Sequence, residues 1–430
     1  MITACGVILN LIQDLSSKKR IPDQVRNDKK SHMDSKEQKI EELLARGVAE
    51  VIDREHLKKR LLAGEKLRVK LGIDPTSPNL HLGRAVPLLK LRDFQELGHK
   101  IVLIVGDFTG QIGDTSDKES ERPMLSSEEV KSNMKSYIEQ AGKILDMDSV
   151  EVAYNSKWLR EMDLGQIGKL AESFSVAEFI ARENIKKRLD GGKRVSLREV
   201  LYPLMQGYDS IAVKADVELG GTDQRFNLLA GRTLQTAAGM EAQDILMTHL
   251  ILGTDGRKMS SSWGNVIALT DSADEMFGKV MSIPDDQILP YFVHCTRTPL
   301  KMVEKIESDL KNGMNPRDAK VILAKEIVNM FHGKVKAASA EAYFVDTFSK
   351  QLVPENVRSI VVRAGTKLVE VLVEAGLAES KSDARRKIEQ GGVEIGSKKI
   401  LDVQVVMEVS FEDQVMKVGK KDFVKIVFQK

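Results

Sequence analysis

Residues 67–105 read LRVKLGIDPTSPNLHLGRAVPLLKLRDFQELGHKIVLIV, and this stretch decides the fold. Leu67–Ile73 and Lys100–Val105 are short apolar runs typical of buried strands, and residues 82–97 between them carry apolar positions at helical spacing. Strand, helix and strand in this order predict a βαβ unit with a right-handed crossover. Further strands are expected at Val150–Tyr154, Val217–Leu219 and Asp244–Leu250. The pattern predicts a doubly wound α/β domain with a parallel sheet, but it does not choose among the enzymes built on that fold.

The chain before this unit contains two different segments. Residues 1–34 are expected to form a poorly ordered extension, because residues 16–30 are polar and charged without periodicity. The apolar stretch Gly6–Ile12 has no basic region before it and no cleavage site after it, which argues against a signal peptide. From Ser35 a helix is expected, since apolar residues recur at three- and four-residue steps at Ile40, Leu43, Leu44, Val48, Val51 and Ile52. The α/β domain is therefore expected to span residues 35–270.

The C-terminal part of the chain is expected to form two further domains. Residues 271–352 should be all-helical, with amphipathic segments at Lys301–Lys311 and Asp318–Phe331. A linker over residues 353–364 contains Pro354. Residues 365–430 should form a small α+β domain with Ser382 as the N-cap of its second helix. Its expected helices are Lys367–Ala375 and Ser382–Gln390, and its expected strands are Val393–Ile395, Val403–Glu408 and Asp422–Phe428.

Composition excludes several classes of protein. The 430 residues allow roughly three domains of about 150 residues each. Hydrophobic residues make up 42% and charged residues 30%, which argues against a disordered or collagenous chain. The net charge of +2 excludes a polycation but not a local basic patch. Cys5 and Cys295 are too few for a disulfide framework or a zinc site, which suits a reducing cytosol. The sequence contains no run of eighteen apolar residues, so no membrane span is predicted.

Two polar segments are candidates for binding a nucleotide. Residues 71–84, LGIDPTSPNLHLGR, run from the end of a strand into the start of a helix, where free N–H groups favour a phosphate. His81 and Arg84 lie one turn apart there, and Gly83 leaves room for a base. The loop 256–265, GRKMSSSWGN, offers Lys258 and three hydroxyls. Taken alone, each segment could be an ordinary helix start or surface turn.

Together the two segments resemble the two signature motifs of class I aminoacyl-tRNA synthetases, because their order, spacing and structural context agree. A third stretch is more specific. Tyr202, Gln206 and Asp209 share one face of a helix, and a buried acid on such a face needs a donor, which a phenol hydroxyl would supply. This stretch, with residues 220–224 (GGTDQ) after it, closely resembles the substrate-binding elements of tyrosyl-tRNA synthetases. The resemblance covers about residues 35–430.

The resemblance implies a Rossmann-like catalytic domain and a role for each matching residue. Catalysis is expected from His81, Arg84, Lys258, Ser261 and the mobile cations Lys118 and Arg122. ATP is expected to contact Gly72, Asp74, His81, Gly83, Gly221, Asp223, Lys258, Met259, Ser260, Ser261 and Ser262. Tyrosine is expected to contact Lys70, Asp114, Asn155, Tyr202, Gln206, Asp209 and Gln224. ATP would act as co-substrate with Mg²⁺, and no metal ligated by the protein is expected.

Three residues depart from the family pattern. Lys70 stands where many bacterial members have a tyrosine that helps to bind the substrate hydroxyl, which leaves more of that task to Asp209. Arg84 replaces the second histidine of the first motif and keeps a hydrogen-bond donor. Ser261 replaces the second lysine of the loop, so that Lys258 is its only lysine. We interpret these changes as a subfamily variant.

The family resemblance extends to RNA. The last domain resembles a small RNA-binding fold, and Lys381, Arg385, Arg386, Lys387 and Lys398 are its expected contacts with tRNA. The helical domain over residues 271–352 would bind the anticodon. The domain from Thr366 onward carries 12 basic and 11 acidic residues, so only their clustering favours phosphate contacts over a solvated helix face. The implied partners are tyrosine, ATP, tyrosine tRNA and a second copy of the chain, in the cytoplasm.

Two other readings remain open. A tryptophanyl-tRNA synthetase would share the fold and both motifs, although Gln206, Asp209 and the last domain favour tyrosine. An inactive RNA-binding relative is conceivable because of Arg84 and Ser261. ATP–pyrophosphate exchange with tyrosine, with tryptophan or with no amino acid would separate these readings.

Overall fold

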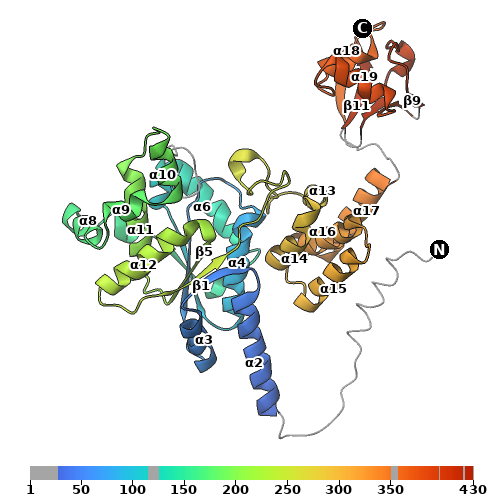
Figure 1. Ribbon diagram of the computed structural model, residues 1–430. Coiled ribbons are helices and arrows are strands. Elements are labelled where there is room, and N and C mark those ends of the chain that lie inside the picture. The colour runs from blue at the N-terminus through green and yellow to red at the C-terminus, as the bar shows by residue number, and fades with distance from the viewer. Residues whose placement is uncertain (1–27, 115–124, 350–356, 397, 420–421, 430) are drawn as a thin grey trace. The chain divides into compact units, whose positions relative to one another are not determined.

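The computed structural model describes residues 28–114, 125–349, 357–396, 398–419 and 422–429 (Figure 1). The expected extension therefore lies mostly outside the described residues. Its last part belongs to helix α2 (Asp28–Ala45), which begins before the predicted start at Ser35. The sequence could not locate this start, because residues 28–35 carry no apolar stripe. None of the described helices is long and apolar enough to cross a membrane.

A six-stranded sheet forms the centre of the α/β domain. Its strands lie in the order β1 (Val48–Ile52), β6 (Asp244–Thr248), β5 (Val217–Gly221), β2 (Arg68–Ile73), β3 (Lys100–Val105) and β4 (Val150–Tyr154). The five strands from β6 to β4 are parallel to their neighbours, whereas β1 pairs antiparallel with β6. The chain runs outward from β2 through β3 to β4, and then returns to β5 and β6 on the other side. The switch in strand order thus falls between β2 and β5, where ligands bind in open α/β sheets.

Helices cover both faces of this sheet. Helix α4 (Leu82–Glu96) connects β2 to β3, and α12 (Arg225–Ala237) connects β5 to β6 in the opposite direction, so right-handed crossovers place them on opposite faces (Figure 1). Helix α11 (Leu197–Ala212) packs on α12. The remaining helices of this part are α3 (Arg54–Ala63), α5 (Thr109–Ile112), α6 (Ser127–Ala141), α7 (Ser156–Leu159), α8 (Leu164–Ala171), α9 (Val176–Ile180) and α10 (Glu183–Asp190), with the 3₁₀ turns η1 (Met147–Ser149), η2 (Thr222–Gln224) and η3 (Ser261–Trp263).

The predicted helix from Ser35 to Ile52 is wrong at its C-terminal end. Val48, Val51 and Ile52 belong to strand β1, where Val51 pairs with Leu246 of β6. Their three- and four-residue spacing happened to continue the apolar stripe of α2. The helix ends before Gly47, whose φ of +68° a helix does not allow.

Residues 271–349 form helices and loops, as predicted. The helices are α13 (Ala273–Met281), η4 (Asp285–Gln287), α14 (Ile288–Cys295), α15 (Leu300–Lys311), α16 (Pro316–His332) and α17 (Lys334–Ser349). The chain divides into two compact units, and residues 273–278 and 332–349 fall in the same unit as the C-terminal domain. Within that unit Phe277 and Phe344 contact each other, with ring centroids 5.4 Å apart.

In its described residues the C-terminal domain has a five-stranded sheet, two α-helices and the 3₁₀ turn η5 (Val409–Phe411). Its strand order is β7 (Arg358–Val362), β11 (Asp422–Phe428), β10 (Val415–Val418), β8 (Val393–Ile395) and β9 (Lys398–Ile400). Helices α18 (Leu368–Glu374) and α19 (Lys381–Glu389) share its apolar core with the sheet.

Two predictions for the C-terminal domain are wrong. Residues 403–408 form no strand, and their only ladder contact is an isolated bridge between Lys367 and Val406. The N-cap of α19 is Ser380 rather than Ser382, because the Ser380 hydroxyl accepts from the backbone N–H of Asp383. Both serines satisfy the capping pattern in sequence, and only the backbone geometry separates them.

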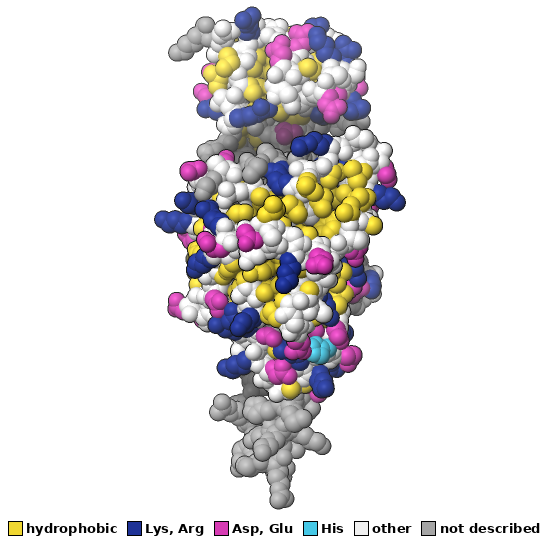
Figure 2. Space-filling view, turned by 90° about the vertical axis from the view of Figure 1, so that its left-hand side faces the viewer, with side chains coloured by type: hydrophobic (Ala, Val, Ile, Leu, Met, Phe, Trp, Pro, Cys, Tyr) yellow, Lys and Arg dark blue, Asp and Glu magenta, His cyan; other side chains and the backbone are white. Residues whose placement is uncertain are grey.

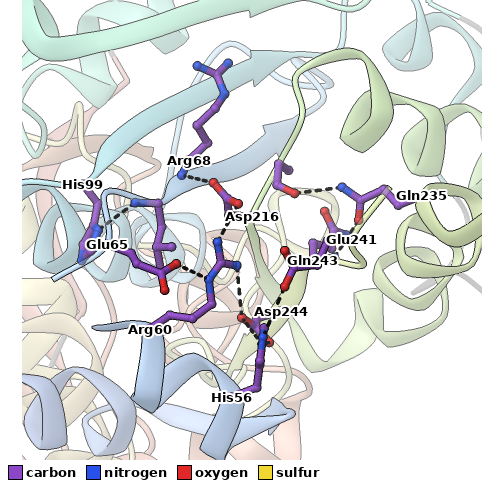
Figure 3. Close-up of polar contacts among 12 residues, drawn as sticks. His56, Arg60, Glu65, Arg68, His99, Asp216, Gln235, Glu241, Gln243 and Asp244 are labelled. Atoms are coloured by element: carbon purple, nitrogen blue, oxygen red, sulfur yellow. Dashed lines mark hydrogen bonds and ion pairs between the residues drawn. The ribbon is translucent and has the colours of Figure 1, made fainter. Parts of the chain in front are cut away.

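A polar cluster holds α3 against the edge of the sheet where strands β2, β5 and β6 begin (Figure 3). Nδ1 of His56 lies 3.0 Å from the buried Asp244 carboxylate, and Nε2 lies 3.4 Å from Glu241. Arg60 pairs with Asp216 at 2.9 Å, and Asp216 accepts from the backbone N–H of Arg68 at 2.7 Å. This edge is opposite the carboxyl ends of the strands, so the cluster serves stability and leaves the ligand edge open.

The cluster gives the fold a predictable pH dependence. The hydrogen bond to Asp244 raises the pKa of His56, so the contribution of His56 to stability is complete below about pH 6.5 and is lost as pH rises through its folded-state pKa. The difference in melting temperature between the parent and His56→Gln should therefore be larger at pH 6 than at pH 8.5.

His99 supplies the matched control for this prediction. Burial lowers the pKa of His99, whose Nδ1 accepts from the backbone N–H of Leu67. The charged form of His99 is disfavoured in the folded state, so His99→Gln should show the reverse trend. The melting temperature of His99→Gln relative to the parent should be highest below about pH 6.5. Parallel pH curves for the parent and both variants would contradict the assignment.

Candidate active site

A cavity of about 670 Å³ lies at the carboxyl ends of the central strands, at the switch between β2 and β5. Its lining brings together segments that are far apart in sequence. The predicted residues that line it are Gly72, Asp74, His81, Gly83, Arg84, Asp114, Asn155, Tyr202, Gln206, Asp209, Gly221, Asp223, Gln224, Lys258, Met259, Ser260, Ser261 and Ser262. Lys118 and Arg122 lie outside the described residues.

Asp209 is the most buried acid of the cavity, with 3% of its surface exposed. Its Oδ1 accepts from the indole Nε1–H of Trp158 at 2.8 Å, and its Oδ2 accepts from Nδ2 of Asn155 at 3.2 Å. Burial raises the pKa of Asp209 to about 7, although the Lys70 ammonium and the two hydrogen bonds oppose this shift. A group with this pKa can accept a hydrogen bond from a ligand hydroxyl at neutral pH.

Tyr202 and Asp74 form a second polar centre. The Tyr202 hydroxyl donates to Oδ2 of Asp74 at 2.7 Å, and Thr109 donates to Oδ1 at 2.7 Å. Burial and the neighbouring carboxylates raise the pKa of Tyr202, so the phenol stays protonated. Gly106 makes this arrangement possible, because a Cβ there would lie 1.9 Å from Oδ1 of Asp74.

Amides and carboxylates occupy the wall beside Tyr202. Gln224 donates to Oδ2 of Asp114 at 2.7 Å, and Asn227 fixes Gln224 by donating to its Oε1 at 2.9 Å. Gln206, one turn along α11 from Tyr202, donates to Glu218 at 3.4 Å. Acceptor oxygens are therefore concentrated here, which suits a cationic group of a ligand.

The opposite side of the cavity is built around the N-terminus of α4. His81 is the N-cap residue, is 7% exposed, and its Nδ1 has no hydrogen-bond partner among the described residues. Burial, with the cations Arg84 and Lys258 nearby, lowers the pKa of His81 to about 3, so the ring is neutral. A Cβ at Gly83 would lie 3.1 Å from the imidazole, so glycine at this position leaves space next to the ring. A buried polar nitrogen at the positive end of a helix dipole is suited to an anionic or nucleotide ligand.

The loop 256–265 lies across this side. Lys258 pairs with Asp223 at 2.9 Å, which joins the loop to the end of β5. Asn265 holds the loop backbone, because its Oδ1 accepts from the N–H of Ser260 at 2.9 Å and its Nδ2 donates to Asp255 at 2.7 Å. The Ser260 and Ser262 hydroxyls are 2.9 Å apart. The hydroxyls and the ammonium therefore face the same cavity as His81.

Arg84 lines the cavity, and its guanidinium contacts the loop after β2 and helix α6. Its guanidinium donates to the Asp74 carbonyl at 3.1 Å, to the Thr76 hydroxyl at 3.0 Å and to the Tyr137 hydroxyl at 2.7 Å. Arg84 thus fixes the segment that carries Asp74.

Comparison with known proteins identifies the family. Residues 61–349 match the family described as tRNA synthetases class I (W and Y), and residues 349–426 match the tyrosine--tRNA ligase SYY-like C-terminal domain. A tyrosine--tRNA ligase of Carboxydothermus hydrogenoformans is 46% identical over 401 residues, covering 90% of this chain and 98% of the relative. One of Thermotoga maritima is 46% identical over 386 residues, covering 89% and 96%.

The chain belongs to the tyrosyl-tRNA synthetase family. Solved structures agree in fold. A tyrosyl-tRNA synthetase of Archaeoglobus fulgidus complexed with L-tyrosine has a TM-score of 0.58 at 23% identity, covering 71% of this chain and 99% of that one. A C-terminally truncated mitochondrial tyrosyl-tRNA synthetase of Aspergillus nidulans has a TM-score of 0.61 at 22% identity, covering 75% and 100%. The predicted Rossmann-like fold of the catalytic domain is confirmed.

Lys70, one of the three departures from the family pattern, does not lie where it was expected. Lys70 was expected to contact tyrosine, but it is fully buried and is not part of the cavity lining. Alternation along β2 points it to the face on which α11 lies, where it pairs with Glu218 at 2.9 Å. The sequence could not show this, because Glu218 comes from β5 and no spacing rule connects the two positions.

Three residues that the sequence analysis did not single out support the tyrosyl-tRNA synthetase site. Trp158 donates to Asp209, and Thr109 donates to Asp74. Glu218 accepts from Gln206 and forms an ion pair with Lys70. The only available signal was weak. Trp158 is one of two tryptophans and follows the end of β4 closely, where an indole donor would face the cavity.

Proposed function

We propose that the cavity activates L-tyrosine with ATP and then transfers the tyrosyl group to the 3′ end of tyrosine tRNA. The observation that carries this assignment is the arrangement of Asp209 in the cavity. It is a buried carboxylate held by two fixed donors, in the same cavity as a neutral buried histidine and the Lys258 loop. One end of the cavity accepts a phenol hydroxyl, the middle accepts an ammonium and the other end accepts a nucleotide.

Each residue has a role in this proposal. Asp209 accepts from the tyrosine hydroxyl, and Gln206, Asp114 and Tyr202 surround the ammonium. Asp223 takes the ribose, while His81, Lys258 and the loop serines contact the phosphates. The tyrosine carboxylate attacks the α-phosphorus in line and pyrophosphate leaves, so these residues contribute positioning and charge stabilisation, without a covalent nucleophile.

Mg²⁺ is proposed to enter with the phosphates of ATP. The described residues contain no group of three or more His, Cys, Asp and Glu side chains that could hold a metal ion. On this proposal the nucleotide carries the cation, which would shield the charge of its phosphates.

Pyrophosphate exchange tests the proposed function. The full chain should exchange labelled pyrophosphate into ATP with tyrosine present and not with tryptophan or without an amino acid. Exchange with tryptophan would favour the second specificity of the matched family, and no exchange with any amino acid would favour an inactive RNA-binding relative.

The proposed site for tRNA includes the helical segment 271–352 and the domain 365–430, with α19 contributing cations. The five candidates differ in their ion pairs. Arg386 and Lys387 pair with Asp383, and Lys381 pairs with Glu370 at 2.7 Å. Arg385 and Lys398 are exposed. Arg385 is therefore the strongest candidate on α19 for a phosphate contact.

Charge reversal tests this site. Arg385→Glu together with Arg386→Glu should raise the KM for tRNA in aminoacylation by about tenfold or more at low salt, and should leave pyrophosphate exchange unchanged, because the cavity lies in the other compact unit. Lys59→Glu together with Lys66→Glu, an equal charge change at two exposed positions in the other compact unit, serves as the control. An unaltered KM for tRNA in the double variant would remove α19 from the tRNA site.

A homodimer in the cytoplasm is also proposed. Large apolar side chains are exposed on α8, α9 and the start of α11, where Leu164 is 83%, Val176 71% and Leu197 73% exposed. Figure 2 shows hydrophobic side chains gathered on the face that these helices occupy at the left of Figure 1. Burial against a second copy would remove this area from water. Sedimentation that shows only monomer at micromolar concentration would contradict the dimer.

A further inference from the structure

The starting observation is a buried ion pair directly beneath the tyrosine site. Lys70 on β2 and Glu218 on β5 have exposed side-chain fractions of 0% and 1%, and Nζ of Lys70 lies 2.9 Å from Oε1 of Glu218. Burying two charges costs several kcal/mol each before their attraction is counted, and apolar replacements of such pairs are often neutral for stability. Stability alone is therefore a weak reason for a lysine and a glutamate in the middle of a parallel sheet.

The ion pair contacts the turn of α11 that carries the proposed substrate ligands. Nζ of Lys70 donates to the backbone carbonyl of Gln206 at 3.1 Å and to the Ser210 hydroxyl at 2.8 Å. Ser210 in turn donates to Oε2 of Glu218 at 3.1 Å. Gln206 and Asp209 thus belong to one helical turn that is tied to the sheet on both sides of Asp209.

Glu218 also decides the orientation of the Gln206 amide. Gln243 donates to Oε2 of Glu218, and Oε1 receives Lys70 and, at 3.4 Å, Nε2 of Gln206. A carboxylate can only accept, so it selects the nitrogen end of the Gln206 amide. The oxygen end of Gln206, which lines the cavity, is then the end left for a ligand, and an ammonium requires an acceptor.

The same ion pair contributes to the charges around Asp209. The titratable groups that act on Asp209 or on its neighbour Tyr202 come from several elements. Lys70 of β2 and Glu218 of β5 act on Asp209. Asp74 after β2, Asp114 after α5 and Arg182 after α9 act on Tyr202. Lys70 lowers the pKa of Asp209 and Glu218 raises it. Lys70 is the cation that favours an ionised Asp209 in this group.

We propose that the Lys70–Glu218 pair is the positioning device of the tyrosine site. It fixes the Gln206 amide with its oxygen available to the substrate ammonium, and it keeps Asp209 an acceptor for the phenol hydroxyl. Neither residue touches the substrate. The inference rests on the proposed function and explains how Lys70 acts without lining the cavity.

Loss of Lys70 and loss of the Glu218 charge should shift the pKa of Asp209 in opposite directions. Without Lys70, Asp209 loses a favourable cation and should hold its proton to higher pH. Without the charge of Glu218, Asp209 should ionise at lower pH. A purely structural role would not produce shifts in opposite directions.

The test is tyrosine-dependent pyrophosphate exchange by the full chain between pH 6 and pH 9. Lys70→Met should raise the KM for tyrosine by about tenfold or more near pH 7, with a KM for ATP within about twofold of the parent, since one pKa unit corresponds to a factor of ten. As the pH is lowered, the KM of Lys70→Met for tyrosine should begin to rise at a higher pH than the KM of the parent. Glu218→Gln should shift the pH at which this rise begins downward, and Lys70→Arg should retain the parent profile.

Lys90→Met is the matched control, because Lys90 is also a buried lysine paired with an acid, at 3.0 Å from Asp93, and does not line the cavity. It should leave the pH profile of the KM for tyrosine unchanged. If Lys70→Met does not fold, Glu218→Gln still tests the sign of the shift, and Lys70→Arg still tests whether a cation is sufficient at this position. Superimposable profiles of parent, Lys70→Met and Glu218→Gln would overturn the inference. A parent chain without tyrosine-dependent exchange would instead refute the proposed function.

Discussion

Lys258→Ala is expected to slow tyrosyl-adenylate formation by about 10²- to 10³-fold, the usual loss for one donor to a transition-state charge in a preorganised site. Ser261 stands where the family has a second lysine, so no other lysine in the loop can take over. The Lys258 ammonium already lies inside the cavity, 2.9 Å from Asp223. The measurement is the kcat of pyrophosphate exchange at saturating tyrosine and ATP.

Arg257→Ala is the control for this prediction. Arg257 precedes Lys258 in the same loop, but it pairs with Asp255 and lies over the ring of Trp263 outside the cavity lining. Its loss should change exchange by less than about threefold, since exposed pairs contribute little. Equal losses in Arg257→Ala and Lys258→Ala would show that the loop requires its fold rather than the Lys258 ammonium. Unchanged exchange in Lys258→Ala would remove its proposed role.

Asp209→Asn is expected to reduce discrimination between tyrosine and phenylalanine by about 10- to 100-fold, the value of a hydrogen bond to a charged group. Tyrosyl-tRNA synthetases are themselves the reference case for rejection of phenylalanine, at about 10⁵-fold without editing, so that starting value is taken from the family. In the variant, the Trp158 and Asn155 donors face an amide that offers one acceptor atom in place of two. The ratio of kcat/KM for the two amino acids measures the effect.

The pH dependence of the parent gives an independent check on Asp209. Its pKa of about 7 means that the carboxylate takes up a proton as pH falls through neutrality, and the protonated group is a poorer acceptor. The KM for tyrosine should therefore rise below about pH 7 in the parent and stay flatter in Asp209→Asn. Asp107→Asn is the control, because Asp107 accepts from Ser156 nearby and does not line the cavity. Discrimination equal to the parent in Asp209→Asn would exclude Asp209 as the hydroxyl acceptor.

Local pattern was sufficient for much of the fold. Strands β3, β4, β8 and β11 have the predicted bounds, because short segments rich in β-branched and aromatic residues between turn residues leave few alternatives. Strand β1 could not be predicted. Whether Val51 faces a helix or pairs with Leu246 depends on a partner almost 200 positions away in the chain. The apolar run at 403–408 shows the reverse error, since strand propensity without a neighbouring strand forms no ladder.

The candidate site could likewise be predicted only in part from the sequence. Motif spacing predicted that His81, Lys258, Tyr202, Gln206 and Asp209 belong together, and all five line one cavity. Spacing could not predict the contacts between them. Lys70 was placed beside the substrate because it replaces a substrate-binding residue of the family, whereas its buried position depends on Glu218 and Ser210 from other elements. Trp158 was missed because no motif marks it.

The contact between Lys258 and Asp223 has a consequence for substrate affinity. In this structure the cation proposed for the phosphates and the carboxylate proposed for the ribose neutralise each other across the nucleotide side of the cavity. ATP must separate them before it can use either one. On the proposed function the chain thus carries its own competitor for ATP, and the measured dissociation constant of the nucleotide equals the intrinsic one divided by the fraction of molecules in which this internal pair is open.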